Sequence, residues 1–177
     1  MYSFRELIGK KVFSGANEEV GVVEGLNITL PEHHVYLEIG GMKMLEIRGQ
    51  YHEFIPIKDV EKFNGGVFLY KNFSSLGEMI KKVHMESNES YNAETLIGMG
   101  VISSDNKEVG TIADIIISNE RMKPFYVLEG PKIEGIRGSR RELLPFLTVE
   151  SIRFFVKIDV SFDYLAQRLK QYPTLET

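Results

Sequence analysis

Four histidines are the residues of this chain best suited to bind a metal or to move a proton. His33 and His34 are adjacent and would point to opposite faces of a strand. His52 and His84 lie far from them in the sequence, and no carboxylate cluster completes a site. The chain has no cysteine, which excludes thiolate ligands and disulfides. We therefore expect no metal and no cofactor.

Nucleophile and phosphate motifs are also incomplete. Ser14 and Ser103 recur at matching places, but neither stands in a nucleophile elbow, so each is better interpreted as a turn hydroxyl that bonds nearby backbone. The glycine-rich stretch "GPKIEGIRGSRR" lacks the Gly-Lys-Ser/Thr ending of a phosphate loop. We expect no catalytic residues and predict that the protein is not an enzyme.

An arginine followed by glycine occurs twice, each time five residues before a glutamate: Arg48 before Glu53, and Arg137 before Glu142. One interpretation is an ion pair across a hairpin within each module, with the glycine supplying an unusual backbone angle. The other is a docking patch on the surface.

The second occurrence lies in a predicted basic loop. Only Glu134 interrupts its positive charges, and the corresponding part of the first half is less basic. We hypothesise that this loop contacts an acidic partner or RNA phosphate, the alternative being ordinary solvated charge. The candidate partner-binding residues are Lys132, Arg137, Arg140, Arg141 and, in the first half, Arg48.

These residues recur because the chain is an internal duplication. "LIGKKVFSGANEEVG" begins at Leu7 and "LIGMGVISSDNKEVG" begins at Leu96, and a shift of 89 positions aligns residues 7–82 with 96–171 without a gap. Almost a third of the aligned pairs are identical. A period of this length is the size of a small domain and too long for a solenoid repeat.

Each copy has mostly strand patterns. Residues 15–18 and 104–107 are turn-rich and lie between short apolar runs, which predicts a hairpin. Gly21 and Gly110 then fall inside strand-like runs and predict a bulge or bend. Further strands are predicted at "VYLEI" and "FYVLE", at "FIPI" and "LLPF", and at "VFLYK" and "VKIDV".

Each copy is predicted to close with an amphipathic helix. The apolar spacing is Leu76, Met79, Ile80 and Val83 in the first copy, and Phe162, Leu165, Ala166 and Leu169 in the second. Such a helix either covers its own module or packs on the sister module or a second chain. The predicted domains are 1–86 and 94–177, with the polar segment 87–93 as a linker.

Charge and hydropathy narrow the functional classes. The formal net charge is −4, whereas a generic nucleic-acid binder usually has a basic excess. No apolar run is long enough for a membrane span, and the N-terminus lacks the apolar stretch of a signal peptide. We therefore expect a cytoplasmic protein with no integral membrane segment.

The repeated phrases resemble the PRC-barrel family. Its members begin with the pattern L-I-G-x-x-V-x-S followed by V-G, here residues 7–21 and 96–110. They continue with an I-P-x-x-x-V phrase, here residues 55–60 and, with Leu144 in the first place, residues 144–149. The resemblance implies a mainly β fold of two tandem small closed β-barrels, each followed by a short α-helix.

The resemblance also implies a function in docking rather than in a reaction. Members include the soluble domain of the photosynthetic reaction centre H subunit, the C-terminal domain of the ribosome-maturation protein RimM, and archaeal adaptors of the FtsZ and SepF cell-division machinery. We expect a non-enzymatic adaptor that joins protein partners, in its most concrete form cell-division proteins. A duplicated module can also make self-complementary contacts, so we expect a dimer or another self-associating state. The alternative is an RNA-linked role in ribosome maturation, with RNA or a ribosomal protein as partner.

Overall fold

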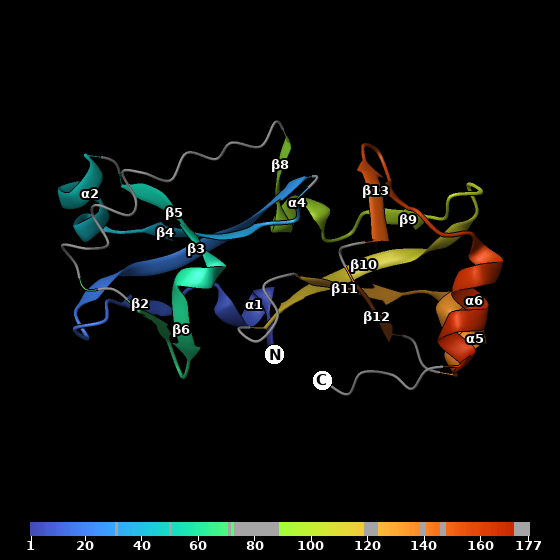
Figure 1. Ribbon diagram of the computed structural model, residues 1–177, viewed down its shortest axis with the longest axis horizontal. Coiled ribbons are helices and arrows are strands. Elements are labelled where there is room, and N and C mark those ends of the chain that lie inside the picture. Colours follow the sequence, from blue (N-terminus) through green and yellow to red (C-terminus); the bar gives the residue numbers. More distant parts are fainter. Residues whose placement is uncertain are drawn as a thin grey trace.

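Two seven-stranded sheets, one built mainly by each half of the chain, form the protein (Figure 1). The computed structural model describes residues 1–30, 32–49, 51–70, 72, 89–118, 124–138, 141–145 and 148–171, apart from the side chains at 47 and 48. We call residues 1–88 the first half and residues 89–177 the second half. The mainly β fold predicted from the sequence is confirmed.

The strands of the first sheet follow one another in the order β5-β4-β3-β2-β7-β6, and β8 joins the edge of β3. All neighbours are antiparallel except β2 and β7, which are parallel. The strands are β2 (Lys11–Phe13), β3 (Glu19–Leu30), β4 (Val35–Gly40), β5 (His52–Pro56), β6 (Val60–Phe63), β7 (Val67–Leu69) and β8 (Glu89–Asn92).

The second sheet repeats this topology in the order β12-β11-β10-β9-β14-β13, with β1 added to β10. Its parallel pair is β9 and β14, the counterpart of β2 and β7. The strands are β1 (Tyr2–Ser3), β9 (Gly100–Ile102), β10 (Glu108–Ile117), β11 (Phe125–Glu129), β12 (Arg141–Pro145), β13 (Val149–Ile152) and β14 (Val156–Ile158).

The two halves exchange their first strands. β1 belongs to the first half but pairs with β10, placing Tyr2 opposite Ile117. β8 belongs to the second half but pairs with β3, with Asn92 opposite Asn27. The exchange is reciprocal and lies at the middle of the molecule, where Figure 1 shows β8 beside the end of β3. Part of the predicted linker 87–93 is therefore a strand of the first sheet.

A short helix follows each exchanged strand and is held by a side-chain cap. The Ser3 hydroxyl accepts from Arg5 N at 3.1 Å before α1 (Phe4–Leu7), and Glu6 completes a capping box. The Asn92 amide oxygen accepts from Glu94 N at 2.8 Å before α4 (Ala93–Leu96). α1 packs on β10 and α4 on β3, so each helix also contacts the opposite half.

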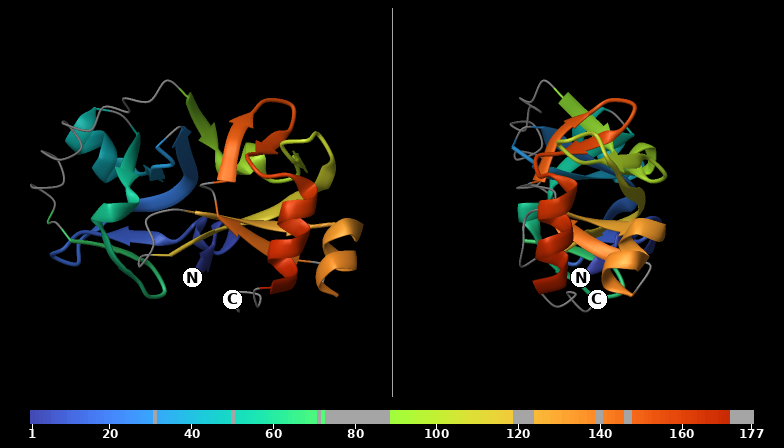
Figure 2. Two further views of the ribbon diagram at one scale, coloured as in Figure 1. Left: turned by 45° about the vertical axis from the view of Figure 1, so that its right-hand side comes forward. Right: turned by 90° about the vertical axis from the view of Figure 1, so that its right-hand side faces the viewer.

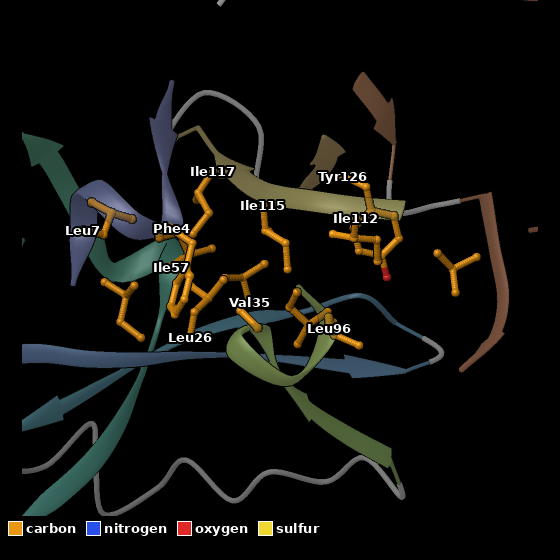
Figure 3. Close-up of a cluster of buried hydrophobic side chains, with 14 of the residues drawn as sticks. Phe4, Leu7, Leu26, Val35, Ile57, Leu96, Ile112, Ile115, Ile117 and Tyr126 are labelled. Carbon is orange, nitrogen blue, oxygen red and sulfur yellow. The ribbon is translucent and has the colours of Figure 1, made fainter. Parts of the chain in front are cut away.

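One hydrophobic core runs through both halves. It includes Phe4, Leu26 and Ile57 from the first half and Leu96 and Ile115 from the second. Figure 3 shows these side chains between the long strands β3 and β10, with α1 and α4 supplying Phe4 and Leu96. Because burial of apolar surface is the main favourable term in folding, this shared core joins the two halves more strongly than a linker would.

The predicted turns and bulges are confirmed. Ser14 N donates to Glu18 O at 2.8 Å, Ser103 N donates to Lys107 O at 2.9 Å, and both serine hydroxyls bond backbone in their own turns. Asn17 has a φ of 61°, in the left-handed region that asparagine tolerates. The ladders of β2 with β3 and of β9 with β10 shift register next to Gly21 and Gly110.

The predicted basic loop is wrong: residues 131–137 form a helix. α5 (Pro131–Arg137) and its counterpart α2 (Met42–Arg48) each begin after one glycine and end before another. Gly138 has a φ of 72°, the left-handed conformation that commonly ends a helix, and Pro131 occupies the first turn. η1 (Ile57–Asp59) is a short 3-10 helix after β5.

The second closing helix is confirmed as α6 (Phe162–Gln171), in which Leu165 and Leu169 are buried. It packs beside α5 in its own half, as Figure 2 shows. The first closing helix was predicted at residues 76–83, which lie outside the described residues. Among the described residues no strand pairing joins β5 to β6 or β12 to β13, so closure of the barrels stays a prediction. No helix in these residues is long and apolar enough to span a membrane.

Candidate interaction surfaces

Arg137 does not belong to an exposed basic surface. Its side chain is 11 % exposed and pairs with Glu142, which is 4 % exposed, so the arginine lies inside the second half. Glu142 also accepts from Leu143 N at 3.1 Å. The ion-pair interpretation is confirmed here, although the pair joins the end of α5 to β12 rather than two strands of a hairpin. The other member of this motif, Arg48, ends α2, and its side chain is outside the description.

Two of the other predicted residues are exposed but already engaged. Lys132 Nζ donates to Glu108 O at 2.9 Å and lies 5.5 Å from the centre of the Phe162 ring. Arg141 is 71 % exposed and lies 3.8 Å from a carboxylate oxygen of Glu129. Arg140 is outside the described residues. Surface contacts of this kind are weak, because solvent screens them, and can be exchanged for contacts with a partner. A docking role for Lys132 and Arg141 therefore stays a prediction.

Of the four histidines, His84 lies outside the described residues, and the other three are distributed over the first half. His52 Nδ1 lies 2.6 Å from Glu24 Oε2 and 3.7 Å from Glu38 Oε1, while His33 is buried and has a positive φ. Among the described residues, no three histidine, aspartate or glutamate side chains are grouped so that they could hold a metal ion.

A carboxylate at the β9–β10 turn holds the start of α6. Asp105 Oδ1 accepts from Ser103 Oγ at 2.5 Å and from Phe162 N at 3.0 Å. The Ser103 hydroxyl, followed by the Phe162 N–H, lowers the pKa of Asp105 well below its usual range. The turn thus fixes the helix that covers this half. The first half has Ala16 at the matching position, so this contact is specific to the second half.

Asp105→Asn is expected to weaken the attachment of α6. Because the folded-state pKa is lowered, the ionised carboxylate stabilises the fold at neutral pH, and this contribution is lost as the pH falls below about 4. Urea unfolding of both proteins from pH 7 down to pH 2 measures it, and the difference between them should shrink with falling pH. Asp163→Asn, at an exposed carboxylate of the same helix, is the matched control. A constant difference across that range would contradict the role of the charge.

Sequence reasoning missed the most exposed large apolar side chain of the described residues. Phe154 is 91 % exposed at the turn between β13 and β14, where Phe155 is 53 % exposed. We call residues 153–155 the Phe154 turn. Its counterpart at 64–66 is Asn-Gly-Gly, so this is a place where the two copies diverge in character. That divergence is visible in the aligned copies as two phenylalanines opposite two glycines.

A small cavity opens beside the counterpart turn. It has a volume of 240 Å³ and is lined by Tyr2, Glu6, Leu7, Lys10, Phe63 and the turn 64–66. We call it the α1 pocket. The Tyr2 hydroxyl donates to Phe63 O at 2.8 Å, and the two rings lie 4.8 Å apart, so one wall of the pocket is fixed by both contacts.

Comparison with known protein families gives a match in the second half of the chain. The PRC-barrel domain model matches residues 88–164. Comparison with curated proteins gave no match. Among solved structures, the chain is similar to a putative 16S ribosomal RNA processing protein RimM from Pseudomonas aeruginosa, with 16 % identity, 89 % of this chain and 98 % of that chain covered, and a TM-score of 0.34. The matched range starts at β8, so it includes the strand that joins the first sheet. Residues 88–164 therefore match the PRC-barrel domain, in agreement with the resemblance of the repeated phrases.

Proposed function

We propose that the protein is a non-enzymatic, cytoplasmic adaptor built from two PRC-type barrels, and that it joins protein partners through exposed turns. The observation that carries the proposal is the Phe154 turn, where a phenylalanine stands 91 % exposed at the end of a hairpin. Aromatic and arginine side chains are enriched where proteins bind one another, and Arg153 is the exposed neighbour of Phe154. The PRC-barrel domain supports the family resemblance on which the adaptor role rests.

The most concrete form of this proposal is a role in an archaeal FtsZ and SepF type of cell-division assembly. It rests on the family resemblance. The shared core and exchanged strands support it indirectly, because they hold two copies of one binding module in a fixed relation. A rigid pair of modules can join two partners at a defined spacing, which is what an assembly scaffold requires.

Phe154→Ser is expected to remove most partner binding while leaving the fold intact, because the side chain it truncates makes few contacts within the chain. Wild type and variant are used as baits in native lysate, and the recovered proteins are quantified by mass spectrometry. Tyr164→Ser, at an aromatic that is 52 % exposed on α6, is the matched control and should keep all partners. Recovery of cytoskeletal division proteins that depends on Phe154 and survives nuclease is the expected result.

Equal recovery by wild type and Phe154→Ser would refute the assignment of this turn. The same experiment tests the RNA-linked alternative, for which Lys132 and Arg141, both exposed, are the candidate cations. Recovery of ribosomal proteins that nuclease abolishes, and that the double variant Lys132→Glu, Arg141→Glu also abolishes, would replace the adaptor with a ribosome-maturation role.

A further inference from the structure

The Phe154 turn of the second copy is the counterpart of the turn 64–66 of the first copy, which borders the α1 pocket. In the turn 64–66, Asn64 N donates to Gly66 O at 3.0 Å; in the Phe154 turn, Arg153 N donates to Phe155 O at 3.1 Å. The two turns therefore share this hydrogen bond, but Gly65 has a φ of 66° and its counterpart Phe154 has no positive φ. Two glycines leave the α1 pocket open beside one turn, whereas two phenylalanines stand on the other.

The α1 pocket suits one apolar side chain better than a metabolite. Its 240 Å³ is below the range of about 300–1,000 Å³ typical of small-molecule sites. Tyr2, Leu7 and Phe63 give it apolar walls, and aromatic rings favour an incoming ring in an edge-to-face or offset arrangement.

The rim of the α1 pocket carries one exposed charge of each sign, Glu6 and Lys10. Glu6 is exposed at the rim, and only one of its carboxylate oxygens, Oε2, accepts from Ser3 N, at 2.9 Å. Arg153 is exposed beside Phe154. With a phenylalanine seated in the pocket, the favourable orientation places this guanidinium toward Glu6 and away from Lys10, because charge complementarity at a rim selects orientation.

The turn and the pocket are on opposite edges of the molecule. In Figure 1 the turn after β13 is at the top, and the tip of β6, which leads into the pocket's turn, points to the bottom; Figure 2 shows the same separation in both views. Phe154 therefore does not reach the pocket of its own chain. A contact between these two surfaces joins one molecule to the next.

We propose that the Phe154 turn of one molecule docks into the α1 pocket of a second copy, with Phe154 in the cavity and Arg153 beside Glu6. The inference rests on the proposed adaptor function and names one of its partners. The contact uses two different surfaces, so it repeats from copy to copy and produces open chains or a ring rather than a two-fold dimer.

The experiment measures solution mass by light scattering and sedimentation across protein concentration. Wild type and the control Tyr164→Ser should grow in mass with concentration. Phe154→Ser should remain monomeric, with self-association weakened by at least about thirtyfold, because a central aromatic is a typical energetic hot spot. Asn64→Trp, which places a bulky side chain at the pocket's border, should also remain monomeric.

Mixing the two defective variants is the decisive test. Phe154→Ser keeps an intact pocket and Asn64→Trp keeps an intact turn, so a mixture should form one-to-one dimers and nothing larger. A wild type that stays monomeric at every concentration, growth in mass that Phe154→Ser retains, or a mixture without dimers would each overturn the inference. If Phe154-dependent capture of another protein persists in that case, the adaptor function still holds. Circular dichroism of each variant checks that the fold is intact.

Discussion

Phe4→Ala is expected to destabilise both halves of the protein together, although Phe4 is the fourth residue of the chain. Its side chain is 6 % exposed, and Figure 3 shows it among Leu26, Ile57 and Ile117, which come from both halves. Truncating a buried phenylalanine to alanine removes apolar contacts and leaves a cavity, at a cost of about 3–5 kcal/mol. Because the core is continuous, the loss should appear in one cooperative unfolding transition at lower urea.

Urea unfolding followed by circular dichroism and by hydrogen exchange measures this effect. Amides of β10 and of β3 should lose protection by a similar free energy, since both strands line the shared core. Phe154→Ala is the matched control: it makes the same substitution at a residue that is 91 % exposed, and should change stability by less than about 0.5 kcal/mol. Two separate transitions, with only one of them shifted by Phe4→Ala, would show that the halves fold independently.

The strand exchange explains why local patterns predicted the elements better than their arrangement. The turns, the bulges at Gly21 and Gly110 and helix α6 depend on neighbouring residues, and the sequence identified all of them. β8 is different, because its residues are polar or half-exposed and carry no apolar alternation. It is held by backbone pairing with β3, about 60 residues earlier in the chain, and by Tyr91, which packs against the core. A sequence pattern does not record which sheet such a strand joins.

The helices α2 and α5 were missed for another reason. Each has seven residues, and among the described side chains of each helix one is fully buried, Met44 or Ile133, so no helical period of apolar residues stands out. The signal that could have found them is the pair of glycines at their ends, Gly130 and Gly138 in the case of α5, together with Pro131. Of the two interpretations offered for Arg137, the ion pair with Glu142 is confirmed and the docking patch is not, because the end of α5 directs this side chain inward.

The two candidate interaction surfaces also differ in whether they are built from residues that are neighbours in the sequence or far apart in it. The Phe154 turn could be found in the sequence as a difference between the copies, because two aromatic residues stand where the first copy has two glycines. The α1 pocket could not be predicted from the sequence, since Tyr2 and Phe63 are far apart in the chain and meet only in the fold. Surfaces built from distant residues leave no spacing to detect in a single sequence.

Arg137→Met is expected to be the most damaging single change at a charged residue of the described structure. Glu142 is 4 % exposed, and losing its arginine would leave a buried carboxylate without its cation, which typically costs about 3–5 kcal/mol. The free energy of unfolding in urea at pH 7 measures the loss. Arg141→Met is the matched control, because this arginine is 71 % exposed and lies 3.8 Å from its glutamate; its effect should stay within about 1 kcal/mol.

The double variant Arg137→Met, Glu142→Leu separates the contribution of the ion pair to stability from the cost of leaving the buried Glu142 carboxylate unpaired. Replacing both partners of a buried pair by apolar residues of similar size is often neutral or stabilising, so the double variant should recover most of the lost stability. If it is as unstable as Arg137→Met, the arginine acts through its packing on α5 and not through Glu142. If it recovers, the Arg-Gly-x-x-x-Glu motif of the second copy is a structural clamp between α5 and β12, and binding must be sought at residues that remain exposed, first of all at Phe154.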